Sequence, residues 1–263
     1  MDKNQMLFYE SLRFFIGPLV KLRLGLKIAG QENIPEFEGA VIASNHRSGL
    51  DPVILSYAVR NRFINYAAAS WSWKIPLYRE LHQWAGAFPL ELSGGKDIDK
   101  QLSRGLELLK DGELVGIFPE GGDTILDPGK AEKIGPFKTG FARLALKARV
   151  PVIPVAIIGI GERRMPTVPG PVVEKFVKHP GSSKGYSSVI YKKAKCRIGV
   201  PLDLGDFYDQ PMTRPVLDEI TSKVRSIVVD LYNGDDLDRF LTGEVPFDFK
   251  YERVRGDAMG KLL

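Results

Sequence analysis

Cysteine and histidine are scarce in this 263-residue sequence, which contains one cysteine and three histidines. The single thiol, Cys196, excludes an internal disulfide framework and a cysteine-rich zinc site, and it is typical of a reducing compartment. It falls in a predicted strand with no base beside it, which favours a structural thiol over a nucleophile. The histidines, His46, His82 and His179, include no pair with metal-ligand spacing, so we expect no metal site.

The N-terminus lacks a long apolar run. Residues 6–16 are apolar at all but three positions, and Gly17-Pro18 is predicted to end the helix that they form. This helix is shorter than the roughly 20 residues that cross a bilayer core. We expect no secretory signal, because a basic region and a cleavage site are missing. Two interpretations stay open, a helix packed on the protein or one lying in a membrane interface. The side chains available to an interface are Leu7, Phe8, Leu12, Phe14 and Phe15.

Charge of one sign is only modestly in excess. The net charge of +5 and the pI near 9.1 suit nucleic acid, anionic lipid or a phosphorylated cofactor without choosing among them. The basic run of residues 192–197 lacks the interleaved aromatic side chains that stack on bases, so no nucleic acid partner is expected. Hydrophobic residues make up 44% of the chain and charged residues 26%, which describes an ordinary globular protein with ample material for a core.

Strand-like and helix-like segments alternate along most of the chain. This order predicts an α/β domain with a largely parallel or mixed sheet flanked by helices. We expect residues 1–30 to be an apolar helix and a basic strand that associate with a membrane, residues 31–235 the α/β domain, and residues 236–263 a loose tail. Predicted strands are 20–28, 39–44, 63–69, 87–92, 114–118, 152–158 and 188–199, and predicted helices are 6–16, 52–59, 74–84, 97–109, 139–149 and 216–232.

The stretch of residues 41–52 combines a strand, a polar turn and a helix start. Residues 41–43 form a short apolar run, His46 falls in the turn, and Asp51 precedes Pro52 at a position typical of a helix N-cap. A turn followed by a cap lets the imidazole meet the carboxylate, and a histidine oriented by a buried carboxylate is the core of a general base. The alternative is a capping Asp and an unrelated polar His.

The stretch of residues 114–123 repeats this architecture. An apolar strand ends in a glycine-rich turn that presents Glu120. Since functional groups gather at the carboxyl ends of parallel strands, His46 and Glu120 are predicted to share one site. Gly121 and Gly122 would let backbone amides approach a ligand closely. The alternative is a simple tight turn.

These two blocks resemble those of the glycerolipid acyltransferase family, whose members acylate glycerol-3-phosphate and lysophospholipids. Asn45-His46 with Asp51 is similar to the family's NHxxxxD motif, and Phe118-Pro119-Glu120-Gly121 to its FPEG motif. The likeness extends in family order over residues 20–235. It implies a glycerol-3-phosphate acyltransferase-like fold and an O-acyltransferase of phospholipid biosynthesis that resembles 1-acylglycerol-3-phosphate acyltransferases. Further similar segments are 86–89, 137–140, 150–155 and 198–202.

The resemblance also implies a mechanism. His46 would deprotonate a hydroxyl of a lysoglycerolipid, Asp51 would fix the imidazole, and the alkoxide would attack the thioester of acyl-CoA or acyl-carrier protein directly. That donor is a co-substrate, and no permanently bound cofactor is implied. The expected partners are membrane lipids and the lysolipid, at the cytoplasmic face of a membrane, in a peripheral or monotopic manner. Candidate substrate-binding residues are Asn45, Arg47, Phe118, Pro119, Glu120, Gly121, Gly122 and Lys138.

Two positions depart from the family pattern. Leu92 and Asp123 stand where lysophosphatidic acid acyltransferases usually carry arginines that hold the acceptor phosphate. Neither residue replaces a bidentate Arg–phosphate contact. Either other cations bind the phosphate, or the acceptor has a different head group, which we favour. Two further functions stay open, a catalytically silent lipid-binding protein on the same fold and a hydrolase in which His46 activates water. The candidate replacement cations are Arg47, Lys130, Lys133 and Lys138.

Overall fold

The computed structural model describes residues 3–59, 62–74, 76–90, 98–121, 134–176 and 182–234. The chain divides into a main body, Met1–Tyr232, and a second unit, Asn233–Leu263, almost all of which lies outside the described residues. The predicted division at residues 30 and 235 therefore stays a prediction. None of the helices in these ranges has the length and apolar character needed to cross a membrane.

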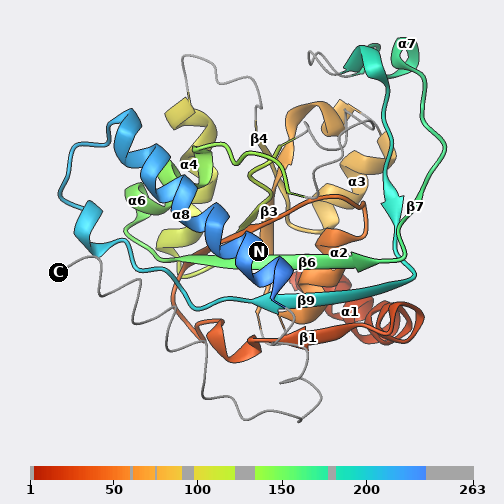
Figure 1. Cartoon of the computed structure of the whole chain (residues 1–263), viewed down its shortest axis with the longest axis horizontal. Coiled ribbons are helices and arrows are strands. Elements are labelled where there is room, and N and C mark those ends of the chain that lie inside the picture. The colour runs from red at the N-terminus through yellow and green to blue at the C-terminus, as the bar shows by residue number, and fades with distance from the viewer. Residues whose placement is uncertain are drawn as a thin grey trace. The chain divides into compact units, whose positions relative to one another are not determined.

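A mixed sheet forms the centre of the body (Figure 1). Across the described residues its strand order is β1-β9-β6-β2-β5-β3-β4, and every neighbouring pair is parallel except β6 and β9, which are antiparallel. The predicted mixed sheet is thus confirmed. The strands are β1 (Lys27–Ala29), β2 (Ala40–Ser44), β3 (Ile64–Ala69), β4 (Phe88–Leu90), β5 (Leu114–Ile117), β6 (Val152–Ile160) and β9 (Lys193–Ile198).

Helices cover the sheet, as the alternating sequence predicted. α1 and α2 contact each other and β9, α2 also contacts β6, and α4 and α6 pack together against β5 and β2 respectively. Every residue of β2 is buried, as expected of a central parallel strand covered on both faces. The helices are α1 (Lys3–Leu24), α2 (Asp51–Ala58), α3 (Pro76–Trp84), α4 (Ile98–Lys110), α6 (Gly140–Ala148), α7 (Gly170–Val173) and α8 (Arg214–Asn233).

The predicted end of the N-terminal helix is wrong. α1 continues through Gly17 and Pro18 to Leu24, and only Lys27–Ala29 of the predicted strand 20–28 is extended. The glycine is needed for packing, because a Cβ at position 17 would lie 2.3 Å from Cδ2 of Tyr57 in α2. Val20 and Leu24 are four residues apart, so the apolar alternation also fits the inner face of a helix. The helix thus continues past Pro18, which removes one of its hydrogen bonds, while its inner face packs closely on α2.

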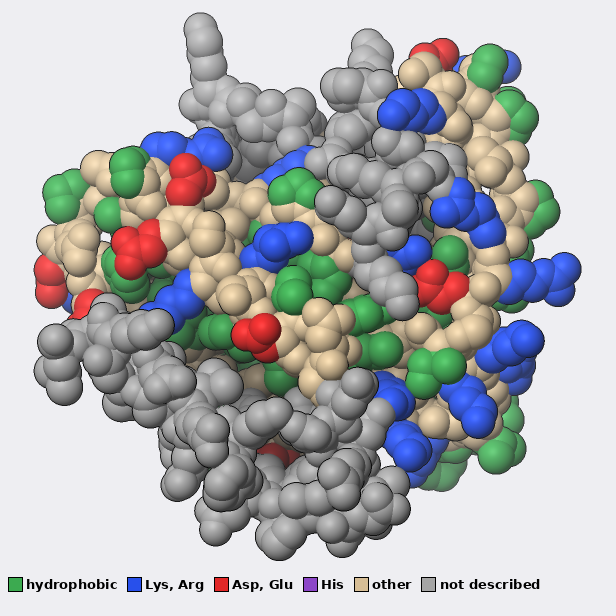
Figure 2. All heavy atoms as spheres, viewed as in Figure 1, with side chains coloured by type: hydrophobic (Ala, Val, Ile, Leu, Met, Phe, Trp, Pro, Cys, Tyr) green, Lys and Arg blue, Asp and Glu red, His purple; other side chains and the backbone are tan. Residues whose placement is uncertain are grey.

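The outer side of α1 is apolar as well. Leu7, Phe14, Phe15 and Leu22 are 67–83% exposed, whereas Tyr9 and Leu24 are buried. Their spacing of seven or eight residues places the exposed four on one side of the helix. Over α1, Figure 2 shows hydrophobic side chains next to Lys and Arg side chains. One face of α1 therefore packs on the protein and another presents apolar surface.

The predicted strand 188–199 is divided in two. β8 (Val189–Ile190) pairs antiparallel with β7 (Arg163–Arg164) in a small separate sheet, and β9 then pairs with β6. In Figure 1 the segment carrying β7 and α7 extends beyond the end of β6. Tyr191 and Lys192 form the junction between the two sheets. The chain thus changes sheets next to the carboxyl end of β2, where the polar turn begins.

Candidate active site

The turn after β2 is held in place by Asp51, the first residue of the helix that follows it. α2 begins at Asp51 with Pro52 in its first turn, and its N-cap is Leu50. The prediction that Asp51 caps a helix starting at Pro52 is therefore wrong by one residue. The Asp51 carboxylate turns back to the preceding loop, where Oδ2 accepts hydrogen bonds from the backbone N–H of Arg47 and of Ser48, both at 2.7 Å. This geometry closes the turn over residues 46–51.

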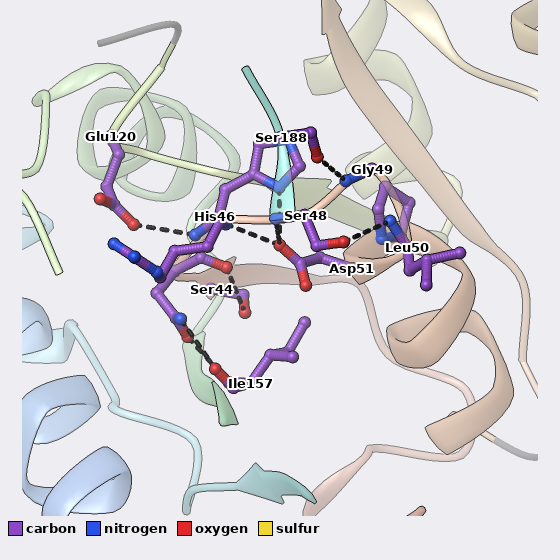
Figure 3. A network of polar contacts seen from close by, with 12 residues as sticks. Ser44, His46, Ser48, Gly49, Leu50, Asp51, Glu120, Ile157 and Ser188 are labelled. Atoms are coloured by element: carbon purple, nitrogen blue, oxygen red, sulfur yellow. Dashed lines mark hydrogen bonds and ion pairs between the residues drawn. The ribbon is translucent and has the colours of Figure 1, made fainter. Parts of the chain in front are cut away.

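His46 contacts Asp51 inside that turn (Figure 3). Nδ1 of His46 lies 3.0 Å from Oδ2 of Asp51, whose side chain is fully buried, while the His46 side chain is 16% exposed. A carboxylate only accepts hydrogen bonds, so Nδ1 carries the proton and Nε2 of the neutral ring is a free base. None of the described residues hydrogen-bonds Nε2. Asp51 therefore orients the ring through Nδ1, while Nε2 is available to accept a proton.

Glu120 meets the same turn from the neighbouring strand. β2 and β5 are parallel and in register from Ala40 with Leu114 to Ala43 with Ile117, so their carboxyl ends lie together. The buried Glu120 carboxylate accepts the backbone N–H of His46 at 2.8 Å through Oε1 and that of Gly135 at 2.7 Å through Oε2. The structure thus brings His46 and Glu120 into one site, and Glu120 holds backbone there.

Other residues of the second block contact the imidazole or Lys138. The ring of Phe118 stacks on His46 at a centroid distance of 4.2 Å and an interplanar angle of 23°. Pro119 accepts the backbone N–H of Lys138 at 2.9 Å. Gly121 has a φ of +66°, and a Cβ there would lie 2.9 Å from Nζ of Lys138. The second block therefore contacts His46 through Phe118 and contacts Lys138 through Pro119 and Gly121.

Two candidate substrate ligands pair with the protein itself. The fully buried Asn45 amide donates to the Ile157 carbonyl at 2.9 Å and accepts the Ile157 N–H at 2.8 Å, which ties the turn to β6. The Arg47 guanidinium pairs with Glu162, with NH2 3.0 Å from Oε2 and Nε 3.3 Å from Oε1. Glu162 is not among the predicted site residues, because it lies in no recognisable sequence motif.

The segment of residues 188–191 is a second partner that the sequence reasoning missed. The Ser48 hydroxyl donates to the Val189 carbonyl at 2.6 Å, and the Gly49 N–H donates to the Ser188 hydroxyl at 3.1 Å. The buried Tyr191 hydroxyl donates to Oδ1 of Asp51 at 2.9 Å. Burial and the Asp51 carboxylate raise the pKa of Tyr191, so its hydroxyl stays protonated. No sequence motif predicts contacts about 140 residues away.

Some predicted positions lie outside the described residues. These are Gly122, a candidate ligand, and Leu92, Asp123, Lys130 and Lys133, which bear on the acceptor's head group. Within the described ranges no group of three His, Cys, Asp or Glu side chains is placed to hold a metal ion.

Comparisons with known proteins agree with this arrangement. The sequence model of the acyltransferase family matches residues 25–158, about half of the chain, which includes both blocks. A 1-acyl-sn-glycerol-3-phosphate acyltransferase of Bacillus subtilis is 28% identical over 83% of this chain and 94% of its own length. The chloroplastic LPAT1 of Arabidopsis thaliana, also named a 1-acyl-sn-glycerol-3-phosphate acyltransferase, is 30% identical over 68% of this chain but only 49% of its own length.

The fold also matches a solved structure. The crystal structure of the 1-acyl-sn-glycerophosphate (LPA) acyltransferase PlsC from Thermotoga maritima aligns with a TM-score of 0.52 and 20% identity, covering 87% of this chain and 82% of that one. This match confirms the predicted fold class, and the family model and the named relatives confirm the predicted enzyme class. With the family model spanning both the NHxxxxD-like and FPEG-like blocks, the chain belongs to the acyltransferase family.

Proposed function

We propose that this protein transfers a fatty acyl group from acyl-CoA or acyl-carrier protein to a hydroxyl of a lysoglycerolipid, with His46 as general base. The observation that carries the proposal is the contact between Nδ1 of His46 and the buried Asp51 carboxylate. It leaves Nε2 unprotonated in the neutral ring and able to accept a proton. Membership of the acyltransferase family supports the reaction class.

The chemistry follows from these two side chains. Nε2 of His46 takes the proton of the acceptor hydroxyl, and the oxygen attacks the thioester carbonyl carbon. The Asp51 carboxylate stabilises the imidazolium that forms. When the C–S bond breaks, the thiolate leaves and receives the proton from His46, so protons balance and no covalent enzyme intermediate is needed. General-base catalysis contributes about 10²–10⁴-fold, so binding and orientation of both substrates supply the remaining acceleration.

The acceptor belongs to the lysoglycerolipids, and its head group is the finer part of the proposal. Relatives are named for 1-acyl-sn-glycerol-3-phosphate, whose phosphate needs cationic ligands. Arg47, the cation next to His46, is paired with Glu162 through two hydrogen bonds, and a guanidinium shared with a carboxylate binds a phosphate less strongly. Leu92 and Asp123 add no cation. We therefore favour an acceptor whose head group is not a simple phosphate.

The exposed apolar side of α1 supports work at a membrane surface. Leu7, Phe14, Phe15 and Leu22 together present four large side chains to solvent. Each large side chain that leaves water contributes roughly 1.5–3 kcal/mol, so a few suffice for reversible attachment. Lys21 and Arg23, exposed in the last turn of the helix, would contact anionic lipid head groups. The site would then act at the cytoplasmic face of a membrane without a spanning helix.

The test combines a donor, an acceptor panel and one variant. Thiol release from acyl-CoA or acyl-carrier protein is measured without acceptor and with lysophosphatidic acid, lysophosphatidylcholine and an uncharged monoacylglycerol, in mixed micelles. We expect release that depends on acceptor and that H46A abolishes while its thermal unfolding stays unchanged. Release without acceptor would support the hydrolase, and no release with any acceptor the silent binding protein. A strong preference for lysophosphatidic acid would refute the head-group proposal alone.

A further inference from the structure

Tyr191 occupies an unusual place in the fold. It lies at the junction where the chain leaves β8, in the small sheet, and enters β9 of the central sheet. Its side chain is 2% exposed, and its hydroxyl donates to Oδ1 of Asp51 at 2.9 Å. A tyrosine hydroxyl buried this deeply needs a partner, and here the partner is the carboxylate that orients His46.

Gly159 of β6 makes room for the tyrosine ring. A Cβ at position 159 would lie 2.2 Å from both Cδ1 and Cε1 of Tyr191, so any other residue would displace the ring. Gly159 pairs with Ala194 in the β6–β9 ladder, which fixes its backbone beside the junction. Gly159 therefore leaves the space in which the Tyr191 ring crosses β6 and reaches Asp51.

The two oxygens of Asp51 receive different partners. Oδ2 accepts hydrogen bonds from the His46 ring and from the N–H groups of Arg47 and Ser48, whereas Oδ1 accepts the Tyr191 hydroxyl. Among the described residues no other donor reaches Oδ1. Without the hydroxyl, Oδ1 of the buried Asp51 carboxylate would lack a hydrogen bond, which costs free energy. Rotation of the carboxylate would reduce that cost. A turn of the carboxylate would change the direction in which the imidazole is held.

We infer that Tyr191 is a positioning residue for the His46–Asp51 pair. Its hydroxyl fixes the rotation of the Asp51 carboxylate, and Gly159 leaves space for its ring. The inference rests on the proposed function, because it assigns Tyr191 an effect on acyl transfer. Tyr191 touches no reacting atom. It acts through Asp51, and the neighbouring Ser188 and Val189 hold the same turn through Gly49 and Ser48.

The first test removes the hydroxyl and keeps the ring. A hydrogen bond to a charged group changes an equilibrium about tenfold to a hundredfold, so Y191F is expected to lower kcat for acyl transfer by that factor. The KM values for donor and acceptor are expected to stay unchanged, since Tyr191 contacts neither substrate. The matched control is Y208F, the same chemical change at a tyrosine that contacts Arg149, which should leave kcat unaltered. A wild-type kcat in Y191F, even with a lowered unfolding temperature, overturns the inference.

The second test uses the glycine. G159A retains the hydroxyl and displaces the ring, so it is expected to lower kcat in the wild-type background and to add little in the Y191F background. Additive losses of kcat in the double variant would contradict the pairing. Wild type and Y191F, compared in the same assay, separate the two claims. No transfer by the wild-type protein means that the proposed function fails, whereas transfer by wild type with a fully active Y191F means that only this inference fails.

Discussion

Replacing Glu120 by Gln distinguishes a residue that holds the site together from one that binds substrate. The buried Glu120 carboxylate accepts two backbone N–H groups, from His46 and Gly135, at 2.8 and 2.7 Å. A glutamine keeps one acceptor oxygen and places an NH2 group against the other N–H. One charged hydrogen bond is lost and a buried donor is left unpaired, while burying a neutral amide recovers part of the cost. The net loss of unfolding free energy is about 1–3 kcal/mol.

The change is measurable by thermal unfolding. For a domain of this size, each kcal/mol lowers the midpoint by about 2–4 °C, so E120Q should unfold about 2–12 °C below wild type. The matched control is E107Q, in which the same change is made at an exposed Glu that pairs with Arg104 at the surface. Such surface changes stay within about 0.5 kcal/mol. E120Q should also lower kcat, because one of the two hydrogen bonds that join the backbone at His46 and Gly135 is lost.

The opposite result would refute this reasoning. A carboxylate kept for binding substrate is buried at a cost, and neutralising it raises or preserves stability while weakening substrate binding. If E120Q unfolds at or above the wild-type temperature and its main defect is a raised KM for the acceptor, Glu120 is a substrate ligand, as the sequence first suggested. A lowered midpoint together with an unchanged KM supports its role as a backbone acceptor that joins the two blocks.

Two other residues give separate predictions. Burial raises the pKa of the fully buried Cys196 to about 12, so its thiol stays neutral. Iodoacetamide at pH 8 should therefore leave the native protein unmodified and label it after denaturation. Rapid labelling of the native protein, detected by mass spectrometry, would contradict the burial. In N45D an oxygen replaces the NH2 donor that faces the Ile157 carbonyl. This change should lower the free energy of unfolding by roughly 2–3 kcal/mol. If denaturant titration finds wild-type stability, this amide does not hold the turn to β6.

The centre of the site could be predicted because its signals are local. The buried run before Asn45 and the Asp-Pro pair after Gly49 indicate a strand and a helix start, and both are present as β2 and α2. Parallel strand order then follows from the alternation of elements, which places Glu120 beside His46. The N-terminal segment was harder, since residues 20–28 satisfy the spacing of a strand and, at Val20 and Leu24, that of a helix. The structure has the helix there, with Gly17 close against Tyr57 of α2, a contact between residues distant in sequence.

The partners of the turn could not be predicted, because they come from distant segments without a motif. Arg47 has the chemistry of a phosphate ligand, and only the fold shows that Glu162 neutralises it. Residues 188–199 are predicted as one strand, yet the strand is broken at Tyr191, whose ring turns inward to Asp51. A motif specifies which groups react, while the orientation of those groups depends on residues that the fold brings in from elsewhere. In this chain Glu120 after β5, Tyr191 before β9 and Ile157 of β6 hold the turn that carries Asn45, His46 and Asp51. The precision of the site therefore depends on the register of β5 and β6 against β2, and of β9 against β6. A variant that shifts one of these strands by a fraction of an ångström should therefore lower the rate without touching a reacting group.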